Sequence, residues 1–249
     1  RYILNIYTDL TQVGIYSLGY KFGFVLLMLT WDPFQKMWDS EKYEIFKKDN
    51  AQYLYQKVFI YTSSILIFVG LCIALFTKDL LRIMADPAFL DAYKIVPIIV
   101  IAYIFQAWTK YCNMGILLEN KTMQIAYGEM VGVIAITLAY FTLIPRYGIY
   151  GAAWATVAGF VARFIWTNMK SMQLYNMKLP WARISLIAFV ATVIYFLSML
   201  SPEDIVASIL FRFTLVIVFI GIFFMMPVLS RNEKKEIWGK IRSLRSATH

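Results

Sequence analysis

The sequence predicts an all-α, polytopic membrane protein, a helical bundle with about seven transmembrane helices and interfacial helices between them. Sixty per cent of the residues are hydrophobic, compared with about 45–50% in soluble domains, and only 16% are charged. The apolar residues gather in seven runs, each near the ~20 residues that a helix needs to cross the hydrocarbon core. The alternating segments of ~10 residues that are typical of membrane barrels are absent from the sequence.

The elements follow one another in a regular order. Residues 1–8 resemble the end of a preceding helix, and a polar turn, Thr8 to Gln12, comes next. Because the chain opens inside an apolar segment without an initiator Met, we expect a fragment whose N-terminal part is missing. Residues 9–229 are predicted to form a seven-helix membrane lobe, and residues 230–249 a basic cytoplasmic tail. The predicted spans are about 14–38, 54–76, 95–118, 123–144, 149–169, 184–200 and 205–229.

The connectors between the spans differ in character. Residues 36–50 are rich in charge, which favours a short amphipathic helix at the membrane surface. Residues 78–94 mix charged and apolar positions and predict a second interfacial helix, broken at Pro87. Tight turns are expected at 119–122 and at 145–148.

The positive residues are distributed unequally between the two sides that seven alternating spans define. One side carries sixteen Lys and Arg residues and the other five, while Arg1, Lys21 and Lys110 lie within spans. The positive-inside rule therefore places the richer side, including the C-terminus, in the cytoplasm. It follows that the turn from Thr8 to Gln12 faces outward. The net charge of +9 fits a protein in an anionic membrane, and no nucleic-acid partner is expected.

Five ionisable residues lie in or near the apolar spans, and they are the candidates for function. An unpaired cation in hydrocarbon costs roughly 3 kcal/mol on insertion scales, so each cation needs water, a partner or the interface. For Lys21, which lies six to eight residues inside the outer end, a cavity-lining role is favoured over snorkelling. For Lys110, both possibilities stay open. Asp32, which precedes a proline, is expected to cap or kink the helix. Glu129 is expected to pair with a neighbouring cation, and Arg163 is expected to snorkel to the interface.

Small residues recur at four-residue spacing, which lets membrane helices approach closely. The pattern occurs at Gly19/Gly23, Gly128/Gly132 and Gly151/Ala155/Gly159. A packing role is favoured over a hinge. The first pair would leave the stem of Lys21 between closely packed backbones.

The sequence carries no sign of an enzyme. Cys72 and Cys112 lie in apolar runs without a matching ligand nearby, and His249 is the single histidine, so a metal site is not expected. No Gly-x-Ser-x-Gly, Walker loop or acidic metal cluster is present in the sequence. We therefore predict no catalysis and no cofactor.

Four stretches of the chain resemble a known family. They are Arg1-Tyr-Ile-Leu with Val13-Gly-Ile-Tyr-Ser-Leu-Gly-Tyr-Lys21, then Phe76-Thr-Lys-Asp-Leu-Leu-Arg-Ile-Met with Phe89-Leu-Asp-Ala-Tyr-Lys-Ile-Val-Pro-Ile, Gly115-Ile-Leu-Leu-Glu-Asn-Lys-Thr and Leu143-Ile-Pro-Arg-Tyr-Gly-Ile-Tyr-Gly-Ala-Ala-Trp-Ala-Thr. Their order resembles the C-terminal half of bacterial polysaccharide (O-antigen, capsule, exopolysaccharide) flippases, within the multidrug/oligosaccharidyl-lipid/polysaccharide exporter superfamily. The likeness covers about residues 1–200. An Asp usually precedes the first Arg in that family, and this chain begins one residue too late to show it.

The resemblance implies a two-lobe exporter with a central cavity in the bacterial cytoplasmic membrane. Its members move an undecaprenyl-pyrophosphate-linked oligosaccharide from the inner to the outer face by alternating access, and cavity cations are thought to hold the pyrophosphate. By position, Arg1, Lys21 and Lys110 are the expected substrate-binding residues. The expected partners are the lipid-linked oligosaccharide, anionic membrane lipid and the missing N-terminal lobe.

Two other functions remain open. A drug or ion antiporter of the same superfamily would need acidic residues deep in the spans, and only Asp32 and Glu129 are available, both near the cytoplasmic side. A membrane enzyme of glycan assembly, such as a polymerase or ligase, would carry a large outward loop. The longest outward connector here is 78–94.

Overall fold

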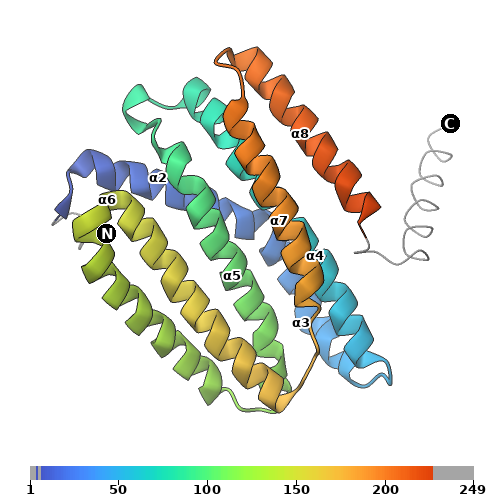
Figure 1. Ribbon diagram of the computed structural model, residues 1–249. Coiled ribbons are helices and arrows are strands. Elements are labelled where there is room, and N and C mark those ends of the chain that lie inside the picture. The colour runs from blue at the N-terminus through green and yellow to red at the C-terminus, as the bar shows by residue number, and fades with distance from the viewer. Residues whose placement is uncertain (1–3, 5–6, 227–249) are drawn as a thin grey trace, which may run out of the picture. The chain divides into compact units, whose positions relative to one another are not determined.

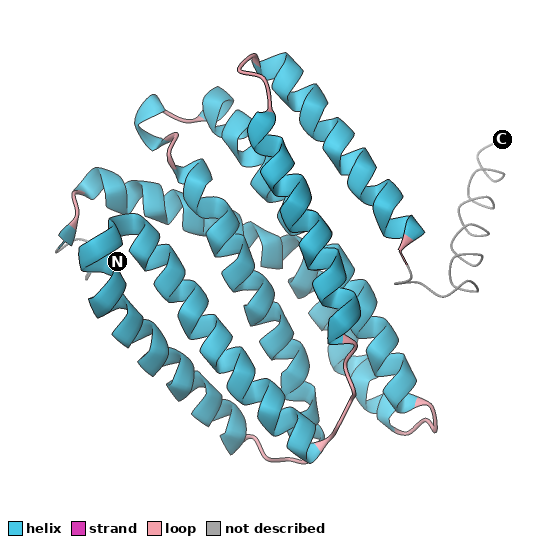
Figure 2. Ribbon diagram, in the orientation of Figure 1, coloured by secondary structure: helices cyan, strands magenta, loops and turns pink. Residues whose placement is uncertain are grey.

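The computed structural model describes residue 4 and residues 7–226, and this part of the chain is helical with short connectors and no strand (Figure 2). The predicted all-α class is confirmed. The elements are α2 (Leu10–Leu26), the π-helix η1 (Leu27–Trp31), α3 (Asp32–Phe46), α4 (Ala51–Met84), the 3₁₀-helix η2 (Pro87–Phe89), α5 (Ala92–Leu118), α6 (Met123–Leu174), α7 (Trp181–Leu197), the 3₁₀-helix η3 (Ser198–Leu200) and α8 (Ile205–Met225). The predicted basic tail, 230–249, lies outside the described residues.

Six helices within the described residues are long and apolar enough to cross a membrane. The stretch from α2 to α3 counts as one continuous helix of 37 residues, and α7 with η3 as one of 20 residues. At 1.5 Å per residue, the 34 residues of α4 reach about 50 Å, well beyond a hydrocarbon core of about 30 Å. The chain is thus a multi-pass membrane protein.

Helix α6 is a hairpin of two helical arms, which lie side by side in Figure 1. The chain reverses at Gly148, whose φ of 55° and ψ of −128° lie outside the helical region and suit glycine. Near the open end of the hairpin, the Trp166 indole donates to the Gln124 carbonyl at 3.2 Å. The arms contain the two apolar runs 123–144 and 149–169, so the predicted turn at 145–148 is present.

The chain divides into two compact units, Arg1–Pro180 (unit 1) and Trp181–His249 (unit 2). In unit 1, α5 packs against α2, α4 and α6 and is the most deeply buried of the candidate spans. A Cβ built on Gly19 would meet Ile95, and one on Gly23 would meet Ile99, so α2 and α5 run parallel. Helix α4 runs antiparallel to α5, since Tyr111 bonds to Tyr55 near one end of α4.

The first helix differs from the prediction at both ends. It begins at Leu10, before the expected start at residue 14, because Asp9 caps it by accepting from the Gln12 amide at 2.8 Å. Residues 36–46 are helical as predicted, but α3 follows η1 without a break as far as Phe46, so this helix is not separate from the first span. The π-helix η1 lies just before Pro33, where the expected kink falls, because proline has no N–H for the preceding turn.

The second predicted interfacial helix, 78–94, is not present as an independent element. Helix α4 includes its first part and ends at Met84, before the proline. Asp86 then caps the single turn of η2 by accepting from the Ala88 amide at 2.9 Å. The expected turn at 119–122 is present, with Asn120 at a φ of 54°.

Unit 2 contains the helix pair α7 and α8. Asp204 caps α8 by accepting from the Ala207 amide at 2.9 Å. Arg212 of α8 is buried, and its guanidinium donates to the Ser201 hydroxyl at 3.4 Å. This hydrogen bond joins α8 to the end of η3.

Candidate functional site

A polar cavity of about 160 Å³ lies in unit 1 between the chain segment η1–α3 and the last turns of α5. Its lining residues are Trp31, Gln35, Trp38, Asp39, Lys42, Lys110, Asn113, Met114 and Leu117. Sites for drug-sized ligands are commonly about 300–1,000 Å³, so this cavity suits a smaller group. Of the three predicted substrate residues, the cavity includes Lys110.

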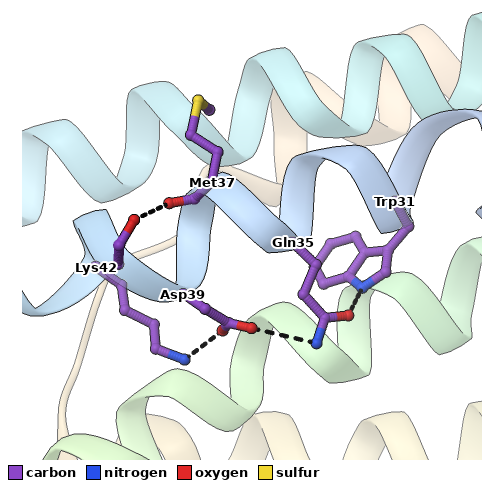
Figure 3. Close-up of polar contacts among 6 residues, drawn as sticks. Trp31, Gln35, Met37, Asp39 and Lys42 are labelled. Atoms are coloured by element: carbon purple, nitrogen blue, oxygen red, sulfur yellow. Dashed lines mark hydrogen bonds and ion pairs between the residues drawn. The ribbon is translucent and has the colours of Figure 1, made fainter.

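A chain of polar contacts follows one face of η1 and α3 (Figure 3). The Trp31 indole donates to Gln35 Oε1 at 2.7 Å, and Gln35 Nε2 donates to Asp39 Oδ2 at 3.5 Å. The Lys42 ammonium then donates to Asp39 Oδ1 at 2.6 Å. The Lys42 side chain is only 11% exposed, whereas Asp39 is 51% exposed, so the carboxylate compensates a largely buried cation.

Hydrogen bonds and ring contacts beside the cavity join α3 and α5 to each other and to α4. The Tyr55 hydroxyl donates to the Lys42 carbonyl at 2.8 Å, and the Tyr111 hydroxyl donates to the Tyr55 carbonyl at 2.7 Å. The Trp38 ring stacks on Tyr111 with centroids 5.3 Å apart and an interplanar angle of 16°. These three contacts join α3 to α4, α4 to α5 and α3 to α5 in turn. The position of Lys42 is therefore set by tertiary packing.

Helix α5 contributes a cation and an unsatisfied acceptor to the cavity. Lys110 is half-buried, and Asn113 Oδ1 is buried without a hydrogen-bond partner among the described residues. Leaving a buried acceptor unpaired costs about 1–3 kcal/mol, so this oxygen favours a water or ligand donor. With Asp39 offsetting one of the two ammonium groups, the cavity has one net positive charge.

Lys21 lies elsewhere, on the exposed face of α2. Gly19 and Gly23 do pack against α5, which confirms the packing role of this pair. Residues two positions apart in a helix point to nearly opposite sides, so Lys21 faces away from that contact. The expectation that packed backbones enclose its stem is therefore wrong.

The structure does not bring the predicted cations into one site. Since Gly19 and Gly23 lie beside Ile95 and Ile99, Lys21 is level with about residue 97 of α5. Thirteen further residues separate this level from Lys110, which corresponds to about 20 Å along the helix. Arg1 lies outside the described residues.

Glu129 and Arg163 form an ion pair between the two arms of α6, as the prediction for Glu129 requires. The Arg163 side chain is 15% exposed and that of Glu129 is 50% exposed. Asp32 is half-buried in the first turn of α3, directly after η1. The described residues contain no group of three or more His, Cys, Asp or Glu side chains that would hold a metal ion.

Four residues of the cavity were not among the predicted site residues: Gln35, Asp39, Lys42 and Asn113. A local signal was present, because Gln35, Asp39 and Lys42 recur at i+4 and i+3 and so share one helix face. The assignment of 36–50 to a surface connector concealed this signal. No local pattern connects these residues with Asn113, which lies on another helix.

Comparison with known proteins places the chain among membrane proteins without identifying a family. The chain matches no family model and no solved structure. It is 24% identical over 213 residues to "Uncharacterized membrane protein MJ1068" of Methanocaldococcus jannaschii. The match covers 81% of this chain and 41% of that protein, so the chain spans less than half the length of its relative.

Proposed function

We propose that the chain is one lobe of a membrane transporter that flips an oligosaccharide linked to lipid through a diphosphate, in surface polysaccharide biosynthesis. The observation that carries the proposal is the position of Lys21. This cation is exposed on a membrane helix, and no described residue forms a hydrogen bond or ion pair with it. An ammonium in that position is stable when its face borders water or an anionic ligand.

The residues around Lys21 favour a further protein lobe that faces the exposed side of α2. Phe24 of α2 and Met28 of η1 are also exposed, so apolar side chains lie near the cation. The relative from Methanocaldococcus jannaschii is more than twice as long as the matched region, which leaves room for another lobe in proteins of this kind. A lobe facing α2 would enclose Lys21 in an aqueous cavity.

Lys21 and Lys110 would act at different stages of transport. At about 20 Å apart, they are too far from each other to hold one diphosphate at the same time. In alternating access, Lys110 would contact the diphosphate headgroup of the substrate on the Lys- and Arg-rich side, which we assign to the cytoplasm. Lys21 would contact the same headgroup on the outer side. Arg1 remains a predicted third contact.

The alternative functions find less support. An ion antiporter needs available carboxylates within the spans, but Glu129 is already paired with Arg163, which leaves Asp32 of the two candidates. A glycan polymerase or ligase needs a long outward loop, but α4 and α5 shorten the predicted 78–94 connector to residues 85–91. Both observations favour the flippase proposal over these classes.

The test replaces Lys21 in the full-length protein and measures surface glycan in a strain that lacks the native gene. Lys21→Ala is expected to reduce surface glycan several-fold at unchanged protein level, because the diphosphate loses a charge-assisted contact. Lys21→Arg should retain most output. The matched control is Arg146→Ala, which removes an exposed cation at the tip of the α6 hairpin. Normal glycan from the Lys21→Ala strain would exclude Lys21 from the mechanism and remove the main support for the proposal.

A further inference from the structure

The polar cavity lies close to the membrane surface at one end of unit 1. Lys110 is eight residues, or about 12 Å, from the end of α5, and Lys42 is four residues from the end of α3. At the same end, Gln52 donates to the Asn176 carbonyl at 3.0 Å and Gln56 to the Met177 carbonyl at 3.3 Å. The connectors at 47–50, 119–122 and 175–180 all lie toward this end, at the bottom of Figure 1. The cavity therefore lies at the depth in the membrane where lipid headgroups are found.

The charges of the cavity favour an anion. An ammonium has three N–H donors, and Asp39 accepts one from Lys42, so Lys42 retains donors for a second acceptor. Lys110 forms no hydrogen bond or ion pair with any described residue. Two ammonium groups facing one small cavity would bind a phosphate through charge-assisted hydrogen bonds. Basic pockets between helices on the cytoplasmic side are known to bind anionic headgroups.

The remaining lining residues agree with a phospholipid rather than a free ion. Trp31, Met114 and Leu117 form an apolar part of the wall, which suits the glycerol and ester region of a lipid. The unpaired Oδ1 of Asn113 would accept from a headgroup hydroxyl. The volume of about 160 Å³ admits a headgroup but not a large soluble ligand.

From these observations we infer that the cavity between α3 and α5 is a binding site for the phosphate of an anionic phospholipid headgroup. Lys42 and Lys110 hold the phosphate, Asn113 accepts from a headgroup hydroxyl, and Asp39 competes with the lipid for Lys42. The inference does not depend on the identity of the transported molecule. It requires only that the protein lies in a membrane that contains anionic lipid.

The experiment uses the full-length protein in a neutral detergent, with lipid retention measured by native mass spectrometry and unfolding by a thermal shift. The added probes are phosphatidylglycerol, phosphatidylcholine and inorganic phosphate at matched ionic strength. We expect phosphatidylglycerol to be retained and to raise the unfolding temperature more than phosphatidylcholine does. Equal effects of the two lipids would overturn the inference. Inorganic phosphate that stabilises as strongly as phosphatidylglycerol would assign the site to a soluble anion and would also overturn it.

Three variants separate binding from folding. Lys110→Gln should lower the affinity for phosphatidylglycerol by about tenfold or more, because a charged hydrogen bond is lost. Asp39→Asn should raise the affinity several-fold, since it removes the competing carboxylate and keeps the side-chain shape. The matched control is Lys121→Gln, at an exposed turn near the same end, which should change little.

The opposite directions expected for Asp39→Asn and Lys110→Gln distinguish a binding site from a structural ion pair. If both variants weaken lipid retention, or if Lys110→Gln behaves like Lys121→Gln, the inference is wrong. Should Lys110→Gln fail to fold, the direction observed for Asp39→Asn still decides the question. The proposed function rests on Lys21, so a negative result in the lipid experiment leaves it in place, and normal glycan output from Lys21→Ala leaves the lipid site in place.

Discussion

At Gly23, the backbone of α2 packs directly against side chains of α5. A Cβ added here would overlap Ile99 and would lie 2.7 Å from Cδ2 and 2.9 Å from Cε2 of Tyr103. The four-residue spacing of Gly19 and Gly23 predicted close packing but not the partner helix. The sequence does not identify the partner helix, because every apolar helix of the chain offers a similar packing surface.

Gly23→Ala should therefore lower the free energy of unfolding by about 1–3 kcal/mol, the usual penalty for overpacking a filled interface. Thermal unfolding in detergent measures the effect. Gly221→Ala is the control, because a Cβ at Gly221 would meet nothing within 4 Å. Equal unfolding temperatures for the two variants would show that the α2–α5 contact has room to adjust.

At the scale of the element, the α6 hairpin depends on contacts between its arms. The chain reverses at Gly148, and the arms are joined further along by the pair of Glu129 and Arg163. A Cβ at Gly159 would lie 3.2 Å from the Gly132 carbonyl oxygen, so the small residues bring the arms close enough for the pair to form. The sequence predicted the turn and a partner for Glu129. The partner's identity follows from the register of the two arms.

Glu129→Gln should destabilise the protein by about 1–2 kcal/mol, because Arg163 then remains largely buried without a counter-charge. The value is below the 3–5 kcal/mol typical of fully buried pairs, since Glu129 is half exposed. Thermal unfolding of both single variants and of Glu129→Gln with Arg163→Gln gives the coupling energy of the pair. Strictly additive effects would mean that the pair contributes no interaction energy.

At the scale of the whole molecule, the distribution of positive charge predicts how the chain is oriented. In the described part of unit 1, Lys121 lies at an exposed turn at the Lys- and Arg-rich end, and Arg146 lies at the tip of α6 at the other end. The positive-inside rule assigns the richer end to the cytoplasm.

Cysteine labelling in cells tests this orientation. In a background with Cys72→Ala and Cys112→Ala, Arg146→Cys should react with a membrane-impermeant maleimide in intact cells. Lys121→Cys should react only after the membrane is permeabilised. Both positions are exposed, so access rather than burial decides the labelling. The reverse pattern would invert the orientation and move the lipid site to the outer face.

The amino-acid sequence by itself determined the helical class, the apolar spans and the close packing of small residues. Each of these follows from patterns within about twenty consecutive residues, where local periodicity and hydropathy decide. Only the tertiary structure decided that Lys110 shares a cavity with Asp39 and Lys42, and that Lys21 lies about 20 Å away. It also showed α3 as a continuation of the first span. These features depend on the register between helices far apart in the chain, which long-range packing of side chains establishes and no local pattern specifies.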